Sequence, residues 1–215
     1  MIKITKGKEP DELLQYRKQK FSSYSGMQSE IKKKILESLL AEQGNLCAYC
    51  MCRISDEEGE NRATIEHCKP QSVFPEKSLD YKNMVAVCSG NRENHIEKDM
   101  TCDAKKGNQL LKVIDVFDER ILDIIAYKSD GTIFSENSDA DEDLDLRLNL
   151  NCPARQLKEC RKAALIKMQA TIAQNFKGKT APKQYFEKLL CEILHKKEKI
   201  PFCGILIWWL KRKIG

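Results

Sequence analysis

The first 45 residues carry the hydrophobic spacing of two helices. Apolar residues recur every three or four positions across 13–16 and again across 31–40, whereas the stretch 22–26 interrupts the pattern. Pro10 with acidic neighbours favours a helix start, because proline fits the first turn and a carboxylate suits the positive end of the helix dipole. Gly44 is typical of a helix stop. The sequence therefore predicts a helical arm whose apolar faces belong to the core.

Residues 46–112 show a different pattern, without a long helical period. The run Ala-Thr-Ile-Glu-His at 63–67 predicts a short strand, which Pro70 ends. The segment has few large apolar residues and is punctuated by Pro and Asn, so it lacks the material for a core of its own. A structural metal ion would supply the missing stability.

Residues 113–215 predict a hairpin and then helices. Two short apolar runs flank Ser129-Asp130-Gly131, which is a hairpin signal, and an acidic stretch at 139–145 leads into a helix. Later helices are expected at 154–176, 184–195 and 202–210, the first with Leu157, Cys160, Ala164, Ile166, Met168 and Ile172 near one side.

The predicted fold class is α+β, mainly helical, in three segments. These are a helical arm at 1–45, a compact centre at 46–112, and a hairpin with a helical C-terminal region at 113–215. The apolar stretch 205–209, which contains two tryptophans, is predicted to pack in the core, although it is also a candidate for docking a partner.

Composition narrows the class of protein. Of the 215 residues, 41% are hydrophobic and 32% charged, which is typical of a globular chain. The net charge of +5 is uneven: residues 158–215 carry +10 and residues 113–157 carry −7. Such a cationic end suits a polyanion, but solvated helix faces explain it equally simply, and charge alone favours the helix faces.

The longest apolar run, 200–210, is too short to span a membrane, and residues 1–10 have no apolar signal region, so we expect a cytoplasmic protein.

Ten cysteines in a reducing compartment predict metal ligands rather than five disulfides. Cys47 and Cys50 form a C-x-x-C knuckle that can present two thiolates to one ion, with a redox pair and chance as alternatives. Cys88 and Cys102, separated by 13 residues, are the best pair to complete a four-coordinate site. Three other residues compete for the fourth position, namely Cys52, Cys68 and His95. The remaining thiols are predicted to be small buried hydrophobes on helices: Cys152, Cys160, Cys191 and Cys203.

A carboxylate and a histidine stand side by side at the end of the predicted strand. Alone, Glu66-His67 is more often a surface pair, but the strand ends there, so the histidine ring lies at a strand-to-loop junction where it can be aimed. Asn83 follows, and Asp103 comes directly after a proposed zinc ligand. Because zinc would fix Cys102, it would also hold Asp103 close to the site.

These motifs, taken together, resemble an HNH endonuclease of the ββα-metal fold. The run IEHCKPQS resembles the HNH segment of RNA-guided CRISPR nucleases. The wider frame, AEQGNLCAYC, LDYKNMVAVCSG and CDAKKGN, resembles the retron-associated HNH proteins and the PtuB subunits of Septu antiphage systems. This resemblance covers nearly the whole chain, although its flanking helices match less specifically than its centre.

The resemblance implies a role for each motif residue. His67 would be the general base that deprotonates water, and Asn83 would tie the loop and help to orient it. Glu66 and Asp103 would hold the catalytic Mg²⁺ or Mn²⁺. Structural Zn²⁺ would be held by Cys47, Cys50, Cys88 and Cys102.

Two lysines complete the implied site. Lys105 or Lys106 would contact a phosphate, with a solvated helix face as the equal alternative. Asp103 departs from the histidine or asparagine that is common at its position in HNH enzymes.

The implied function is hydrolysis of nucleic-acid phosphodiesters, with DNA as the default substrate and RNA, including tRNA, left open. The implied partners are a PtuA-like ATPase of the ABC/SMC type and, in retron loci, a reverse transcriptase with its multicopy single-stranded DNA. The rival hypothesis is a zinc-stabilised nucleic-acid-binding or adaptor module without chemistry, which the knuckle and the cationic C-terminal region fit equally well.

Overall fold

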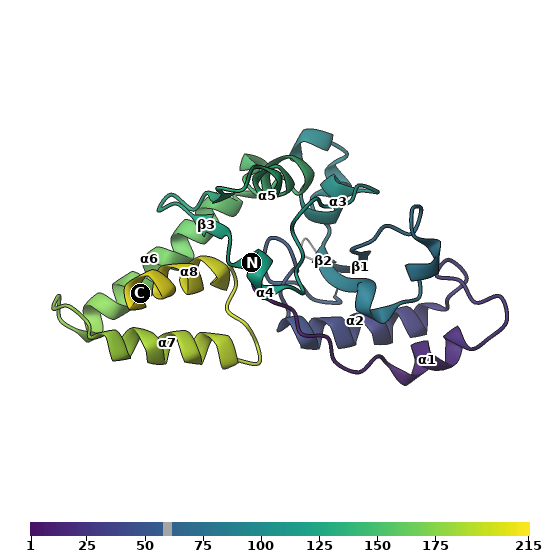
Figure 1. The fold of residues 1–215 in the computed structure, drawn as a ribbon, viewed down its shortest axis with the longest axis horizontal. Helices are drawn as coiled ribbons and strands as arrows, with labels where there is room; N and C mark the ends of the chain where they lie inside the picture. The colour runs from purple at the N-terminus through teal and green to yellow at the C-terminus, as the bar shows by residue number, and fades with distance from the viewer. Residues whose placement is uncertain (58–61) are drawn as a thin grey trace.

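The computed structural model describes residues 1–57 and 62–215. The fold is α+β and about 47% helical (Figure 1). Two separate antiparallel strand pairs, β1–β2 and β3–β4, are set among the helices. The helices and strands are α1 (Asp11–Arg17), α2 (Ser29–Gln43), β1 (Ala63–His67), β2 (Met84–Cys88), α3 (Cys102–Lys106), α4 (Glu119–Leu122), β3 (Ile125–Tyr127), β4 (Ile133–Ser135), α5 (Ser138–Glu142), α6 (Leu157–Asn175), α7 (Lys183–His195) and α8 (Cys203–Ile214).

The N-terminal arm forms the two predicted helices, which support the first strand pair. Helix α2 ends at Gly44, whose left-handed φ of 60° closes the last turn, as the sequence predicted. The buried side of α2, which includes Ile35 and Leu39, packs toward β1 and β2. In Figure 1 both helices lie below this strand pair.

Strands β1 and β2 pair antiparallel, and α3 follows them in the chain. The register sets Ala63 opposite Cys88 and His67 opposite Met84. All five residues of β2 are buried, because α2 and α3 both contact this strand. The strand predicted at 63–67 is confirmed, and its end is the place where Glu66 and His67 lie.

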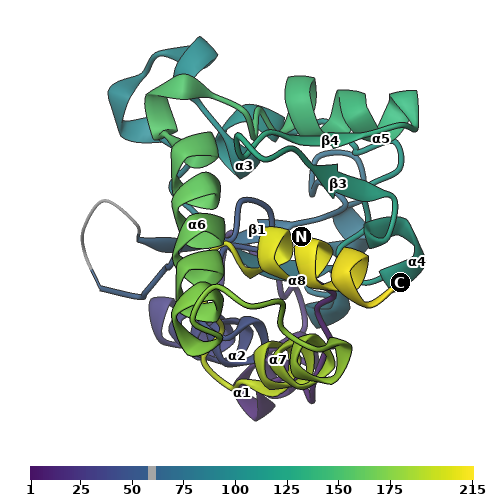
Figure 2. The ribbon, with the colours of Figure 1, turned by 90° about the vertical axis from the view of Figure 1, so that its left-hand side faces the viewer.

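The C-terminal region is organised around α8. This helix lies against α6, α7 and β3, and its buried face includes Ile205, Leu206 and Leu210 (Figure 2). The predicted hairpin and the three later helices are therefore confirmed. The apolar stretch 205–209 packs into the core, and its docking alternative is not needed to explain it.

Two sequence predictions about burial are wrong. Ile166, which the spacing grouped with the apolar residues near one side of α6, is 52% exposed, whereas Arg161 is buried. Arg161 tolerates burial because its guanidinium donates to the backbone oxygens of Gly131 at 2.6 Å and of Leu150 at 2.9 Å. Of the four thiols expected to be buried, Cys191 is exposed on α7 and Cys160 is half-buried, whereas Cys152 and Cys203 are buried.

The core links all three predicted segments. Buried residues from the arm, the centre and the C-terminal region belong to one hydrophobic cluster. The backbone N–H of Phe202 donates to the oxygen of Met51 at 2.9 Å, which joins the start of α8 to the cysteine knuckle. Among the helices that the structure describes, none combines the length and the apolar character that crossing a membrane requires.

Candidate metal centre and adjoining acid-histidine site

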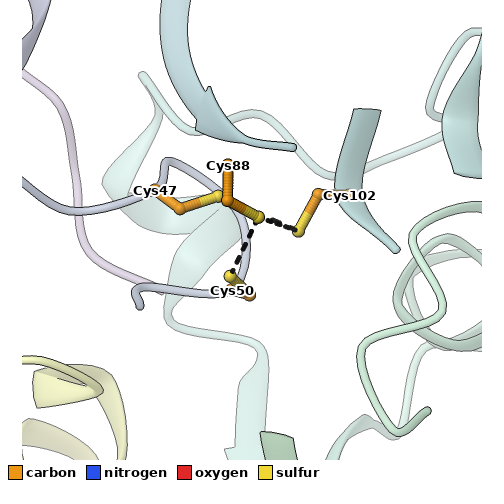
Figure 3. Close-up of side chains that lie close together, drawn as sticks. All are labelled: Cys47, Cys50, Cys88 and Cys102. Atoms are coloured by element: carbon orange, nitrogen blue, oxygen red, sulfur yellow. Dashed lines mark hydrogen bonds between the residues drawn. The ribbon is translucent and has the colours of Figure 1, made fainter. Parts of the chain in front are cut away.

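Four cysteine side chains from three elements converge on one point (Figure 3). Cys47 and Cys50 come from a tight turn after α2, in which the N–H of Met51 donates to the oxygen of Cys47 at 3.0 Å. Cys88 ends β2 and Cys102 begins α3. The four sulfur atoms lie within 4.8 Å of one another, and all four residues are buried.

The sulfur spacing fits a tetrahedral zinc ion. Zn–S bonds of about 2.3 Å give a tetrahedron whose edges are about 3.8 Å long. The Sγ–Sγ distances are 3.8 Å for Cys47–Cys102, 3.8 Å for Cys50–Cys88 and 3.7 Å for Cys88–Cys102. These are too long for disulfides, and burying four thiolates is costly without a cation. The four cysteines can therefore hold a metal ion such as zinc, as the sequence predicted.

Backbone geometry brings Cys102 back to Cys88 across the 13-residue insertion. The N–H of Thr101 donates to the oxygen of Gly90 at 2.9 Å, which closes the base of the insertion. A Cβ at Gly90 would lie 2.2 Å from the oxygen of Thr101, so this approach requires glycine. Cys102 itself has a left-handed φ of 54°, which is costly for a non-glycine residue and is compensated by its place in the cluster.

The competing ligands lie outside the four-cysteine cluster. His95 is exposed in the insertion. Burial raises the pKa of the Cys68 thiol to about 12. Cys52 is buried beside the cluster, where its hydrogen bonds with Cys47 and neighbouring thiols raise its pKa.

His67 is buried and both of its ring nitrogens have partners. Nε2 lies 2.9 Å from the backbone oxygen of Ser78, and Nδ1 lies 3.1 Å from Nε2 of Gln71. A carbonyl only accepts and an amide NH₂ only donates, so these partners select the tautomer with its proton on Nε2 and a lone pair on Nδ1. The ring of Tyr24, from the N-terminal arm, packs edge-on at a centroid distance of 4.6 Å. Burial lowers the pKa of His67, which favours the neutral imidazole.

Glu66 and Lys106 form a buried ion pair. Lys106 Nζ lies 2.6 Å from Glu66 Oε1, and the two side chains are 0% and 7% exposed. The N–H of His67 donates to Glu66 Oε2 at 2.9 Å, and the Tyr49 hydroxyl donates to Oε1 at 3.4 Å. Burial, together with the charge and hydrogen bonding of the neighbouring Asp103, raises the pKa of Glu66 to about 8, although Lys106 opposes this shift.

Asp103 forms an ion pair with a second basic side chain, Arg92. Arg92 Nη2, from the insertion, lies 2.7 Å from Asp103 Oδ2, and this carboxylate is 16% exposed while the arginine is 55% exposed. Asp103 also lies close enough to Glu66 for its charge and hydrogen bonding to raise the pKa of Glu66. Each of them is balanced by a basic side chain.

Asn83 clamps the loop between β1 and β2. Its Oδ1 accepts from the N–H of Lys69 at 2.8 Å, and its Nδ2 donates to the oxygens of Lys69 at 3.0 Å and Lys77 at 3.2 Å. This loop carries both partners of the His67 ring, so Asn83 fixes the surroundings of the imidazole. The resemblance described above implies a loop-tying contact of this kind.

The two predicted phosphate-binding lysines lie in different environments. Lys106 is buried against Glu66, so the alternative of a solvated helix face is wrong for this residue. Lys105 is partly exposed and lies 3.5 Å from Glu97. A phosphate contact by either lysine stays a prediction.

Several residues of the site escaped sequence analysis. Gln71 stood within the motif IEHCKPQS, which could have marked it, whereas Arg92, Tyr24 and Tyr49 carry no local signal. Tyr24 and Arg92 reach the site from the arm and from the insertion. Comparison with known proteins adds nothing to this picture, since no protein-family model and no curated protein sequence matches the chain.

Proposed function

We propose that this protein is a metal-dependent endonuclease of the HNH type, in which β1, β2 and α3 form a ββα-metal core. The single observation that carries the proposal is the buried His67, whose backbone N–H donates to Glu66 Oε2 at 2.9 Å and whose imidazole lies within the electrostatic influence of Asp103. A base, two hard oxygen ligands and nearby cations are the groups that phosphodiester hydrolysis requires.

His67 is proposed as the general base. Ser78 holds the Nε2 proton, so the basic Nδ1 is the atom that would take a proton from water. Gln71 occupies the position in front of Nδ1 and thereby marks where that water would lie. Asn83 and Tyr24 keep the ring in place from the loop side and from the arm.

Glu66 and Asp103 are proposed to hold Mg²⁺ or Mn²⁺, because two adjoining carboxylates are the donor type that these ions prefer. Such an ion would stabilise the negative charge that develops on the phosphate and the leaving oxygen. Lys106, buried beside Glu66, would limit the repulsion between the two carboxylates. The cysteine cluster would hold α3, and with it Asp103, in position.

A cleavage assay tests this function. Purified zinc-loaded protein is incubated with supercoiled DNA, single-stranded DNA and RNA, with Mg²⁺, with Mn²⁺ and with neither ion. We expect strand cleavage only with added Mg²⁺ or Mn²⁺, leaving 5′-phosphate and 3′-hydroxyl ends. Binding without cleavage under every condition, with zinc intact, would instead support the adaptor hypothesis.

We further propose that the nuclease serves antiphage defence together with a PtuA-like ATPase of the ABC/SMC type. A nuclease with free access to the host genome would be lethal, so restraint by a partner is expected. The cleavage assay therefore includes an arm with the co-expressed ATPase, and one with the retron reverse transcriptase and its multicopy DNA. Cleavage that depends on the ATPase supports this assignment, and a chain that never co-purifies with it opposes it.

Divalent-ion affinity is expected to rise with pH. Burial and Asp103 raise the pKa of Glu66 to about 8, so near neutral pH a proton competes with a metal ion for this carboxyl. Raising the pH removes the competing proton, so the Kd for Mn²⁺ should fall by up to roughly tenfold per pH unit below about pH 8 and level off above it. Calorimetric titration of zinc-loaded protein measures this, with Glu66→Gln expected to bind weakly and without that slope. A Kd that is constant across this range contradicts the prediction.

Removal of Arg92 is expected to tighten binding of the same ion. Arg92→Ala takes away the cation that pairs with Asp103, so the carboxylate becomes more available. Since exposed pairs are worth up to about 1 kcal/mol, the Kd for Mn²⁺ should fall about threefold to fivefold. Lys105→Ala is the matched control, because it removes the same charge two residues from Asp103 but pairs with Glu97. If the two variants lower the Kd equally, the loss of one positive charge explains the effect, and the specific contact between Arg92 and Asp103 does not.

A further inference from the structure

The turn between α1 and α2 displays an aromatic ring to solvent. Phe21 is 89% exposed, the highest value among the exposed large hydrophobic residues of the described chain. Its backbone has a left-handed φ of 64°, a conformation that costs energy for a bulky residue. Neither feature serves the hydrophobic core, so the exposure of this ring needs another explanation.

The turn is held in a defined shape. The buried Tyr16 donates its hydroxyl to the backbone oxygen of Ser23 at 2.9 Å, and the N–H of Gly26 donates to Ser23 Oγ at 3.1 Å. Arg17 Nη1 donates to the oxygen of Leu79 at 3.3 Å, which ties the turn to the loop after β1. Phe21 therefore stands on a braced turn, which lowers the entropy cost of using it for binding.

The same turn reaches the proposed active site. Tyr24, three residues after Phe21, packs on the His67 ring at 4.6 Å. Leu79, which Arg17 contacts, follows Ser78, the residue whose oxygen accepts from His67. A ligand that touched Phe21 would therefore lie at the rim of the His67 site.

Basic and aromatic side chains alternate along this rim. Residues 17–34 contain six basic residues and one acidic residue. Three lysine ammonium groups lie over aromatic rings on the turn and on the loop after β1 to which Arg17 ties it: Lys20 over Phe21 at 5.1 Å, Lys32 over Tyr24 at 4.8 Å, and, within that loop, Lys69 over Phe74 at 5.7 Å. Proteins that bind single-stranded nucleic acid combine basic side chains, which contact the phosphates, with aromatic rings, on which the bases stack.

We propose that this rim, formed by residues 17–24 with Lys32, Lys69 and Phe74, binds single-stranded nucleic acid and that Phe21 stacks on an unpaired base. Bases in a duplex are already stacked, so an exposed ring favours single strands, loops or frayed ends. The lysines would contact the flanking phosphates. This inference rests on the proposed function, since it names the substrate class that would enter the His67 site.

Binding without turnover tests the rim. Zinc-loaded full-length protein, without added Mg²⁺ or Mn²⁺, is titrated into labelled single-stranded DNA, single-stranded RNA and duplex DNA of about 20 residues, and fluorescence anisotropy gives each Kd. We expect tighter binding of single strands than of the duplex, and the DNA and RNA arms identify the preferred sugar. Phe21→Ala should weaken single-strand binding about tenfold, or about 1.4 kcal/mol.

Matched variants separate stacking from mere apolar contact. Phe21→Trp should bind as the parent does, whereas Phe21→Leu should resemble Phe21→Ala, because leucine keeps apolar area without a π face. Leu146→Ala removes another strongly exposed apolar side chain, 63% exposed, and should leave binding unchanged. Lys18→Gln with Lys20→Gln should weaken the binding of all polyanions and lower its salt dependence.

The outcomes distinguish this inference from the proposed function. If binding depends on Phe21 but the protein never cleaves, the proposed binding surface is supported and the proposed nuclease function is wrong. If cleavage depends on divalent ions but all Phe21 variants bind single strands with the same Kd, the nuclease function is supported and the proposed binding surface is wrong. Phe21-dependent binding to anionic lipid vesicles, or to the ATPase, without oligonucleotide binding would also overturn the rim.

Discussion

Replacing His67 with alanine is expected to lower the rate of phosphodiester cleavage by about a thousandfold, within the 10²–10⁴ range of general-base catalysis. The ring nitrogen Nδ1 carries the lone pair because the oxygen of Ser78 holds the proton on Nε2, and Gln71 Nε2 lies 3.1 Å from Nδ1 where the attacking water would have to replace it. Burial lowers the pKa of His67, so the imidazole is already neutral at pH values where an exposed histidine would be partly charged. The other two histidines, His95 and His195, are both exposed, so neither offers a second buried imidazole.

The measurement is the initial cleavage rate at saturating Mg²⁺ or Mn²⁺, on the substrate that the wild-type protein cuts. His195→Ala is the matched control, since it removes an exposed histidine at the end of α7 and should leave the rate unchanged. Zinc content and thermal melting show whether His67→Ala remains folded. A folded, zinc-loaded His67→Ala protein that cleaves at the wild-type rate would eliminate the proposed mechanism.

Replacing a cysteine of the metal cluster is expected to have the largest effect on stability. Cys88→Ser removes one of four buried ligands whose sulfur atoms have the spacing of the corners of a zinc-sized tetrahedron. Structural zinc contributes on the order of 10 kcal/mol, which is comparable to the whole stability of a typical domain. The expected result is loss of about one zinc ion per chain and unfolding of the region around β2 and α3.

Metal analysis and thermal melting check this result, and other cysteines provide the controls. Cys191→Ser changes an exposed thiol on α7 and should keep both zinc and stability. Cys52→Ser is more discriminating, because Cys52 contacts the cluster without being among its four ligands and should retain zinc. Zinc lost from Cys52→Ser but kept by Cys102→Ser would show that the ligand set is wrong.

Local patterns predicted much of the fold. The helix stop at Gly44, the strand ending at His67 and the turn at Asp130-Gly131 all follow from the conformational preferences of a few neighbouring residues. The same preferences place Asp103 at the start of a helix, directly after Cys102. Within the described residues these features form where the sequence indicated.

Burial along α6 shows where local patterns fail. Hydrophobic spacing grouped Ile166 with the apolar residues near one side of the helix, yet Ile166 is exposed and Arg161 is buried. The guanidinium is stable there because the turn at Gly131 and the chain at Leu150 supply carbonyl acceptors. Since these acceptors come from elements distant in sequence, no periodicity within α6 could reveal them.

The sequence by itself determined which residues are able to do chemistry: a knuckle with two thiols, an acid-histidine pair at a strand end, and an acidic residue beside a later cysteine. Only the tertiary structure decided which of them meet. It selected Cys102 over Cys52, Cys68 and His95, because the Gly90 contact returns the chain to β2 after the insertion. It also buried Lys106 against Glu66 and brought Arg92 and Tyr24 into the site. Such contacts depend on how distant segments pack, whereas residue type and spacing fix only what each segment can offer.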